Sequence, residues 1–309
     1  MPTPRVLFFG YSEVGYAALE WLLARETTIA GVFTHADDPG ETNWFRSVAA
    51  LATSHQLPVF TPDSLKDPAW VEKIRALRPD LILSFYYRNM IPGRLLALAP
   101  LGAFNLHGSY LPRYRGRAPL NWAIINGEDH TGVSLHVMVK EADAGDLVDQ
   151  EKIPLWPDEP VTAVLPRVRE AAVAVLSRQL EALLAGRAPR VSQDHTQATY
   201  FGKRTAEDGR IDWSRSARPI FNLVRALTHP FPGAFTEITQ PGTTRRLLIW
   251  SGRVRDDAPA QPPAPGTVLQ LSPLVVACGE GAFEVGEAQW ASQAESPSPA
   301  GLNVGDRFG

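Results

Sequence analysis

The chain has 309 residues, with 30 Lys and Arg against 33 Asp and Glu, which gives a formal net charge of −3. A protein that binds nucleic acid over a large surface usually has an excess of basic residues, so the near balance of charges argues against a nucleic-acid-binding protein. The single cysteine, Cys278, excludes an internal disulfide and a cysteine-based zinc site, and we expect it to be a small buried residue. No charged-then-apolar signal opens the chain and no apolar run is long enough to span a bilayer, so we expect cytoplasmic residence.

Apolar stretches alternate with segments of helical spacing through the first two hundred residues. The stretch 80–86 is almost continuously apolar, as in strands that are buried on both faces of a parallel sheet. We therefore predict an α/β, Rossmann-like domain with a mostly parallel sheet over residues 1–199. The predicted strands are 5–10, 28–35, 57–60, 80–86, the run through Asn105, 131–139 and 147–153, and the predicted helices are 14–24, 45–53, 68–77, 91–99, 122–126 and 161–184.

From about residue 200 the predicted elements become short and rich in turns. Short strands at such intervals indicate a small β-barrel or sandwich, so we expect a second domain over residues 200–309. Its predicted strands are 211–213, 245–250, 266–271 and 274–278, with one helix at 220–227.

A glycine pair, Gly10 and Gly15, follows the first predicted strand and raises the question of a dinucleotide site. Its spacing is G-x-x-x-x-G and not G-x-G-x-x-G, so the tight turn and close phosphate approach are not encoded. No Lys-Ser/Thr pair follows, which also excludes a P-loop. An NAD(P)-dependent oxidoreductase is therefore disfavoured, although the strand, turn and helix fit a Rossmann-like architecture.

Asn105 and His107 lie two residues apart on an apolar, strand-like run that ends at Gly108. Both side chains therefore point to one face, near the edge where open α/β sheets bind ligands. An amide donor beside an imidazole suits an oxyanion that develops during acyl transfer. Asp143 offers a carboxylate that would orient the imidazole and favour its protonated form, although a self-capping turn also explains it.

The loop after this strand, residues 108–122, carries three arginines, two prolines and two tyrosines, which is too basic and too rigid for an ordinary linker. With this loop the chain resembles the folate-dependent formyltransferases, a family that includes methionyl-tRNA formyltransferase and the sugar N-formyltransferases. Within the family it most resembles the UDP-4-amino-4-deoxy-L-arabinose formyltransferases, including the formyltransferase part of the bifunctional polymyxin-resistance enzyme. The segments that carry the resemblance are 33–35, 38–41, 84–88, 104–122, 127–128, 131–136, 140–145, 201–204 and 230–235.

The resemblance implies transfer of a formyl group from 10-formyltetrahydrofolate to the primary amine of a nucleotide-linked amino sugar. It also implies an open barrel of OB type for residues 200–309. It assigns an oxyanion donor to Asn105, a proton carrier to His107 and the orientation of that imidazole to Asp143. The residues that it implies for the folate are Asn89, Met90, Ile91, Arg117, Val139, Lys140, Glu141, Ala142 and Asp143, although core packing alone also explains Met90 and Ile91.

Basic side chains near a stackable ring suggest contacts with the nucleotide sugar. No close cluster of histidines and carboxylates has the spacing of metal ligands, so we predict no metal site. The candidate substrate residues are Arg113, Arg115, Phe201, Lys203 and Arg204. The remaining histidines, which we expect to be structural or at the surface, are His35, His55, His130, His136, His195 and His229.

Two other functions stay open. A methionyl-tRNA formyltransferase would be expected to read closer to Ala-Ser-Leu-Leu-Pro where this chain has Gly-Ser-Tyr-Leu-Pro at 108–112. The intact set of amide, imidazole and carboxylate argues against the second alternative, a non-catalytic nucleotide-binding module.

The bifunctional relative continues into a decarboxylase module, whereas this chain ends at Gly309. We therefore expect a stand-alone transferase or an excised domain. This weakens the link to arabinose, and with it to lipopolysaccharide modification and polymyxin resistance, and it leaves open another 4-amino sugar on UDP or dTDP. The expected partners are small molecules, without a membrane and without nucleic acid; a homodimer is left open.

Overall fold

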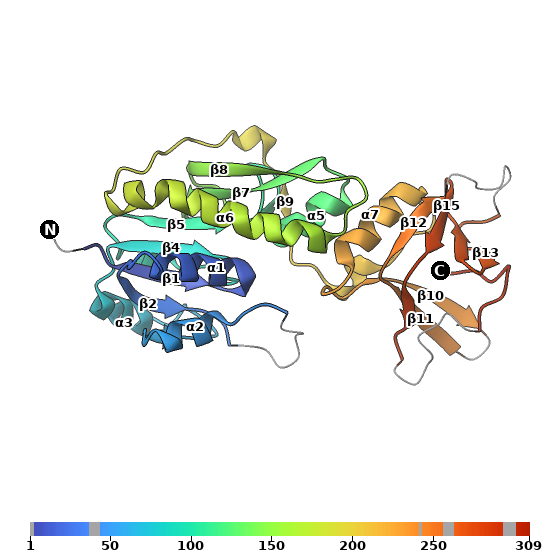
Figure 1. Ribbon diagram of the computed structural model, residues 1–309, viewed down its shortest axis with the longest axis horizontal. Coiled ribbons are helices and arrows are strands. Elements are labelled where there is room, and N and C mark those ends of the chain that lie inside the picture. Colours follow the sequence, from blue (N-terminus) through green and yellow to red (C-terminus); the bar gives the residue numbers. More distant parts are fainter. Residues whose placement is uncertain (1–2, 37–43, 241–242, 256–262, 293–300) are drawn as a thin grey trace. The chain divides into compact units, whose positions relative to one another are not determined.

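The computed structural model describes residues 3–36, 44–240, 243–255, 263–292 and 301–309 (Figure 1). It divides into two compact units. The first unit holds residues 1–119, 130–154 and 165–202, and the second holds residues 120–129, 155–164 and 203–309.

The first unit is built on a 7-stranded sheet in the order β3-β2-β1-β4-β5-β7-β8 (Figure 1). The pairs from β3 to β5 are parallel, whereas β7 runs antiparallel to β5, and β8 runs antiparallel to β7. This confirms the predicted Rossmann-like, mostly parallel sheet. The strands are β1 (Val6–Gly10), β2 (Ile29–Phe33), β3 (Val59–Phe60), β4 (Leu81–Phe85), β5 (Ala103–His107), β7 (His130–Val137) and β8 (Leu147–Pro154).

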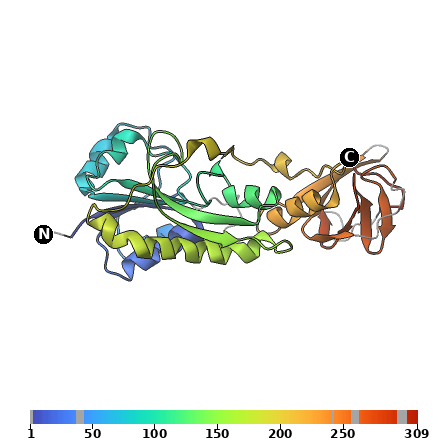
Figure 2. The same ribbon diagram turned by 90° about the horizontal axis from the view of Figure 1, so that it is seen from above.

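Helices cover both faces of the sheet, which explains why β1, β2 and β4 are buried along their whole length. On one face, α3 (Ala69–Leu77) and α4 (Gly93–Leu96) pack on an apolar cluster that includes Leu7, Phe33 and Ile82. On the other lie α1 (Ser12–Leu23), α2 (Val48–Ser54) and the long α6 (Val161–Leu184) (Figure 2). No helix in the described part of the chain is both long and apolar enough to cross a membrane.

Two helices are shorter than predicted, for local reasons. The Ser47 hydroxyl accepts a hydrogen bond from the Ala50 amide at 3.2 Å, and this N-cap starts α2 three positions after the predicted residue 45. Pro92 has an extended ψ of 140°, so Ile91 and Pro92 lie outside α4.

The remaining elements of the 115–201 region are β6 (Arg115–Gly116), α5 (Pro119–Ile125), the 3₁₀ turn His195–Gln197 and β9 (Tyr200–Phe201), with β6 parallel to β9.

The second unit is β-rich, as predicted, and its strands are antiparallel. One sheet has the order β10-β11-β16 and another has the order β12-β15-β14-β13. The predicted strand at 211–213 is wrong, because Ile211 and Asp212 have no regular secondary structure and Trp213 begins a turn, whereas the isolated bridge to Phe235 is made by the preceding Arg210. The elements are the 3₁₀ turn Ala206–Gly209, α7 (Ala217–Leu227), β10 (Ala234–Gln240), β11 (Thr243–Ile249), β12 (Gly252–Arg255), β13 (Val268–Leu271), β14 (Leu274–Ala277), β15 (Ala282–Val285) and β16 (Ala288–Trp290).

Cys278 follows β14 and is 1% exposed, as predicted for a small buried residue. Burial raises the pKa of its thiol to about 12. A thiol that is both inaccessible and protonated is a poor nucleophile, so we expect no reaction with Ellman's reagent in the native protein and complete reaction after unfolding in guanidinium chloride. Rapid labelling of the native protein at neutral pH would contradict this burial.

Candidate active site

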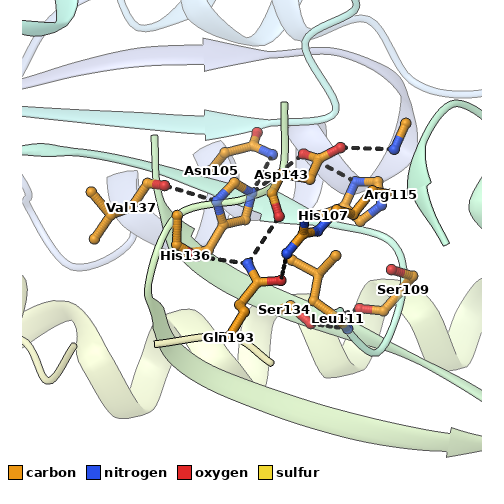
Figure 3. Close-up of polar contacts among 12 residues, drawn as sticks. Asn105, His107, Ser109, Leu111, Arg115, Ser134, His136, Val137, Asp143 and Gln193 are labelled. Carbon is orange, nitrogen blue, oxygen red and sulfur yellow. Dashed lines mark hydrogen bonds and ion pairs between the residues drawn. The ribbon is translucent and has the colours of Figure 1, made fainter. Parts of the chain in front are cut away.

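Strand β5 presents Asn105 and His107 to the same side of the sheet, as the sequence predicts (Figure 3). Its antiparallel neighbour β7 sets His136 directly opposite Asn105. The Asn105 Nδ2 atom lies 3.2 Å from His136 Nε2. His136 is only 2% exposed, so it is not a surface histidine, and its contacts with Asn105 and Asp143 place its ring beside the candidate catalytic residues.

Asp143 lies in the loop between β7 and β8, with one carboxylate oxygen between two imidazoles (Figure 3). Its Oδ1 atom is 3.6 Å from His107 Nδ1 and 3.4 Å from His136 Nε2. Its Oδ2 atom accepts a hydrogen bond from the Gly116 amide at 2.9 Å. Although burial raises the pKa of Asp143, the charges of His107 and His136 and these hydrogen bonds outweigh burial and hold that pKa well below its usual range. The carboxylate is therefore ionised at neutral pH.

The backbone fixes one ring proton on each histidine. His107 Nε2 lies 2.8 Å from the Tyr114 carbonyl, and His136 Nδ1 lies 2.9 Å from the Val137 carbonyl. A carbonyl only accepts, so each of these nitrogens carries a hydrogen. A second proton on His107 would lie on Nδ1 and face Asp143. Both ring nitrogens of His107 are thus engaged, and direct proton transfer from Nε2 requires the Tyr114 hydrogen bond to be exchanged.

The His136 contact orients the side-chain amide of Asn105. In the neutral form of His136, whose hydrogen is on Nδ1, Nε2 accepts from one of the two Nδ2 hydrogens of Asn105, whereas in the protonated form the Nε2 hydrogen faces Asp143 instead. The second Nδ2 hydrogen has no partner among the described residues, and the Asn105 side chain is only partly buried. The arrangement thus leaves one oriented amide hydrogen for a ligand.

Two glycines allow the backbone to close around Asp143. A Cβ atom on Gly145 would lie 1.9 Å from the Val137 carbonyl, so the loop turns back on β7 only with glycine here. Gly116 has φ of +96°, and a Cβ atom there would lie 2.2 Å from the Phe201 carbonyl. These close approaches bring the end of β7, strand β6 and strand β9 together at the carboxylate.

Side chains of β7 and β8 hold the loop that follows β5. The Ser134 hydroxyl donates to the Ser109 carbonyl at 2.7 Å and accepts from the Leu111 amide at 3.0 Å. Gln150 Nε2 donates to the Leu111 carbonyl at 2.9 Å. Further on, the Tyr114 amide donates to the Thr199 hydroxyl at 2.8 Å. These bonds fix the Tyr114 carbonyl, and through it the ring of His107.

The five predicted substrate residues differ in their exposure to solvent and in their contacts. Arg113, Lys203 and, in part, Arg204 are exposed. Phe201 is stacked on Tyr114 with ring centroids 4.9 Å apart, so one face of its ring is covered. Arg115 is 1% exposed and its Nη atoms bind other side chains of the first unit. This burial conflicts with a diphosphate contact from Arg115, because the guanidinium would have to leave the interior to reach a ligand.

Of the predicted folate residues, Ile91 is buried, whereas most of the others are exposed or half-buried. Ile91 and Met138 pack in the same apolar cluster, so their sequence neighbours Met90 and Val139 flank it, and these are 60% and 42% exposed. Asn89 Nδ2 donates to the Asp63 carbonyl at 3.2 Å. Arg117, Lys140 and Glu141 are exposed, and Ala142 is half-buried. Across the described ranges, no group of three or more histidine, cysteine or acidic side chains is arranged to hold a metal ion.

The lowered pKa of Asp143 predicts a pH dependence of stability. A depressed native pKa means that the unfolded chain binds this proton first, so the contribution is complete above the ordinary aspartate range and is lost as pH falls below it. We expect the difference in the free energy of unfolding between wild type and Asp143→Asn to shrink below about pH 4 in urea titrations. A difference that stays constant between about pH 6 and about pH 3 would contradict the assigned contacts.

The family of the chain follows from comparison with known proteins. Residues 5–180 match the formyl transferase family, and residues 203–303 match the formyl transferase C-terminal domain. The chain therefore belongs to the formyl transferase family.

Solved structures share this fold. HypX from Aquifex aeolicus in complex with tetrahydrofolic acid aligns with a TM-score of 0.63 at 20% identity over 94% of this chain, which spans 45% of HypX, about half its length. WlaRD, a sugar 3N-formyl transferase determined in the presence of dTDP and 5-N-formyl-THF, aligns with a TM-score of 0.70 at 16% identity over 95% of this chain and 100% of its own. An N-formyltransferase from Helicobacter canadensis, in complex with folinic acid and dTDP-3-aminofucose, aligns with a TM-score of 0.69 at 16% identity over 91% of this chain and 98% of its own.

Proposed function

We propose that the protein transfers a formyl group from 10-formyltetrahydrofolate to the primary amine of a nucleotide-linked amino sugar. The sugar that its motifs favour is UDP-4-amino-4-deoxy-L-arabinose or a similar 4-amino sugar. The observation that carries the proposal is the ionised Asp143 between two imidazoles, beside an amide that keeps one hydrogen for a ligand. This arrangement suits an acyl transfer in which an oxyanion must be stabilised.

Each side chain has a separate task in this reaction. The bound formyl donor supplies the carbonyl carbon that the amine attacks. Asn105 donates its second Nδ2 hydrogen to the carbonyl oxygen, where negative charge grows as the new C–N bond forms. His107 faces the ionised Asp143 through Nδ1 and adds positive charge when it carries a second proton, and it delivers a proton from Nε2 once the Tyr114 bond is exchanged.

The protons balance across the reaction. The attacking amine loses one proton, and the nitrogen that departs from the formyl carbon gains one, so a single proton carrier suffices. Asp143 stays ionised throughout, because its pKa lies well below the usual range. His136 holds the Asn105 amide in place through Nε2.

The residues proposed for the folate fit a flat, partly apolar ring system. Met90 and Val139 expose apolar surface at the border of one packed cluster. A pocket for a pterin needs such surface together with backbone donors and acceptors, which the loop from Val139 to Asp143 offers. The exposed Arg117 suits a carboxylate of the donor.

An amino sugar on a nucleotide fits the chain better than tRNA. The net charge of −3 offers no overall attraction for a polyanion. Arg204 lies over the Trp122 ring at 4.9 Å, and its buried Nη1 has no hydrogen-bond partner within the described residues. Unlike Arg115, Arg204 is partly exposed, so its guanidinium can meet a phosphate oxygen, and we assign Arg204 and its exposed neighbour Lys203 to the diphosphate.

The decisive experiment incubates the protein with 10-formyltetrahydrofolate and a panel of UDP- and dTDP-linked 3-amino and 4-amino sugars. Formylated products are detected by mass spectrometry, and tetrahydrofolate release is followed in parallel. We expect turnover with a UDP-linked 4-amino sugar and none with charged initiator tRNA. Formylation of the tRNA and of none of the sugars would overturn the substrate assignment, and absence of all formyl transfer would leave a nucleotide-binding module.

A further inference from the structure

We propose that Arg115 and Gln193 are positioning residues that hold the backbone of the Asp143 loop, and thereby place its carboxylate between the two imidazoles (Figure 3). This inference rests on the proposed function and goes beyond it. It gives Arg115 an internal role in place of the predicted contact with the diphosphate.

Gln193 is the direct link to the loop. It is 6% exposed, and its Nε2 atom donates to the Asp143 carbonyl at 2.9 Å and to the Gly145 carbonyl at 2.6 Å. The same loop is held from the other side, where the Gly116 amide donates to the Asp143 carboxylate. The loop is thus fixed at its main chain by Gln193 and at its side chain by β6.

Arg115 fixes the orientation of Gln193. Its Nη2 atom donates to Gln193 Oε1 at 2.6 Å, which leaves the amide nitrogen of Gln193 facing the loop carbonyls. The same Nη2 lies 3.1 Å from His195 Nδ1, and Nη1 donates to the Tyr200 hydroxyl at 2.9 Å. The Tyr200 hydroxyl in turn donates to Glu141 Oε1 at 2.9 Å, so this chain of bonds ends on the same loop.

The buried Arg115 side chain is surrounded by the polar groups of Tyr200, Gln193 and His195 and not by a carboxylate among the described residues. The side chain is 1% exposed, it forms no ion pair with a carboxylate in the described part of the chain, and its buried Nε has no partner there. A buried charge without an opposite charge is unfavourable, and an apolar residue of similar size often serves stability as well or better. A guanidinium at this position therefore serves the geometry of the site, since only a planar fork reaches Gln193 and Tyr200 together.

Asp143 itself explains why the loop needs such support. Its φ is +55°, in the left-handed region that aspartate adopts less readily than glycine. Its carboxylate also lies 3.4 Å and 3.6 Å from the imidazole nitrogens, so a small movement of the loop would separate the charges. A hydrogen bond to the Asp143 carbonyl therefore holds both the left-handed backbone of Asp143 and the position of its carboxylate between the imidazoles.

The test compares Gln193→Leu, Arg115→Met and the double variant with Arg178→Met. Arg178 is the matched control, because it lies on α6 of the same unit and pairs with Asp149 and Glu151, away from Asp143. Two readouts are taken for each protein. One is kcat and KM with the best amino sugar at a temperature where all variants are folded, and the other is amide hydrogen exchange of the peptide covering residues 138–146.

We expect Gln193→Leu and Arg115→Met each to lower kcat about tenfold to a hundredfold, with little change in KM for the sugar. Exchange of the loop peptide should be about tenfold faster in both, and Arg178→Met should change neither readout. In Gln193→Leu the loss of rate in acid should also begin at higher pH, because a displaced Asp143 has its pKa lowered less by His107 and His136. The double variant should be more stable than Arg115→Met, because it leaves no buried Gln193 Oε1 atom without a partner. Its kcat should nevertheless stay as low as in the single variants.

The outcomes separate this inference from the proposed function. Wild-type kcat in both single variants, or unchanged exchange of residues 138–146, would overturn the positioning role. A kcat that recovers in the double variant together with its stability would show a purely structural role and also overturn it. If the wild type formylates no amino sugar, the proposed function fails, and the exchange of the loop peptide still decides whether Arg115 and Gln193 hold the loop.

Discussion

Replacing Asp143 by asparagine should lower kcat about a thousandfold while leaving the fold intact. The amide has the shape of the carboxylate and can still accept the Gly116 amide hydrogen bond, so the loop keeps this anchor. What is lost is the negative charge that faces His107 and His136 at 3.6 Å and 3.4 Å. Without it the cationic form of His107 loses its counter-charge, and both rings lose the group that orients them.

The measurement is steady-state kinetics with the best amino sugar, with circular dichroism as the check on folding. Asp149→Asn is the matched control, because Asp149 makes the same kind of charged contact with Arg178 on the same unit but outside the site. That variant should keep wild-type turnover. A folded Asp143→Asn with more than about a tenth of the wild-type rate would remove Asp143 from the catalytic machinery.

The second large effect is expected at the two residues of β5. Asn105→Ala removes the donor to the developing oxyanion and should lower kcat about a hundredfold or more. His107→Ala removes the proton carrier and the positive charge, and we expect a loss of about a hundredfold to ten-thousandfold. KM for the folate should change little in either variant, since both groups act mainly on the charge that forms in the transition state.

His55→Ala serves as the control for these variants, because His55 is an exposed residue at the end of α2. It should have wild-type kinetics. Near-normal turnover in His107→Ala would refute the proton-carrier role and would leave the Tyr114 hydrogen bond as the only function of that ring. Near-normal turnover in Asn105→Ala would mean that another donor meets the oxyanion.

The sequence predicts the common face of Asn105 and His107 from the two-residue periodicity of a strand. Asn105 and His107 are two residues apart on one strand, so their common face needs no knowledge of the rest of the chain. The apolar runs of β1, β2 and β4 predict the buried parallel sheet in the same way, since each is buried along its whole length.

The site residues that the sequence did not predict in these roles depend on strand register and on burial. His136 faces Asn105 because β7 pairs with β5 in one particular register, and nothing local to residues 131–136 specifies that register. Alternation along β7 could have placed His136 on the same face as Ser134, but not opposite Asn105. Arg115 and Gln193 lie in polar, basic segments that look solvated, and only the packing of β6 against β9 and the Asp143 loop buries them.

The strands of the second unit were harder to predict for a related reason. Strands such as β12 (Gly252–Arg255) and β15 (Ala282–Val285) mix small, charged and apolar residues over four positions. Such short segments gain most of their stability from cross-strand partners, for example Arg253 and Arg255 against Glu284. A strand of this kind is defined by its neighbours more than by its own residues.

The antiparallel addition of β7 to the parallel part of the sheet makes catalytic competence depend on the docking of this strand. A partially folded chain in which β7 had not yet docked would already display Asn105 and His107, yet it would lack both the second imidazole and the acid that follows β7. Such an intermediate would be inert toward activated acyl donors. Turnover is thereby reserved for chains whose central sheet is complete.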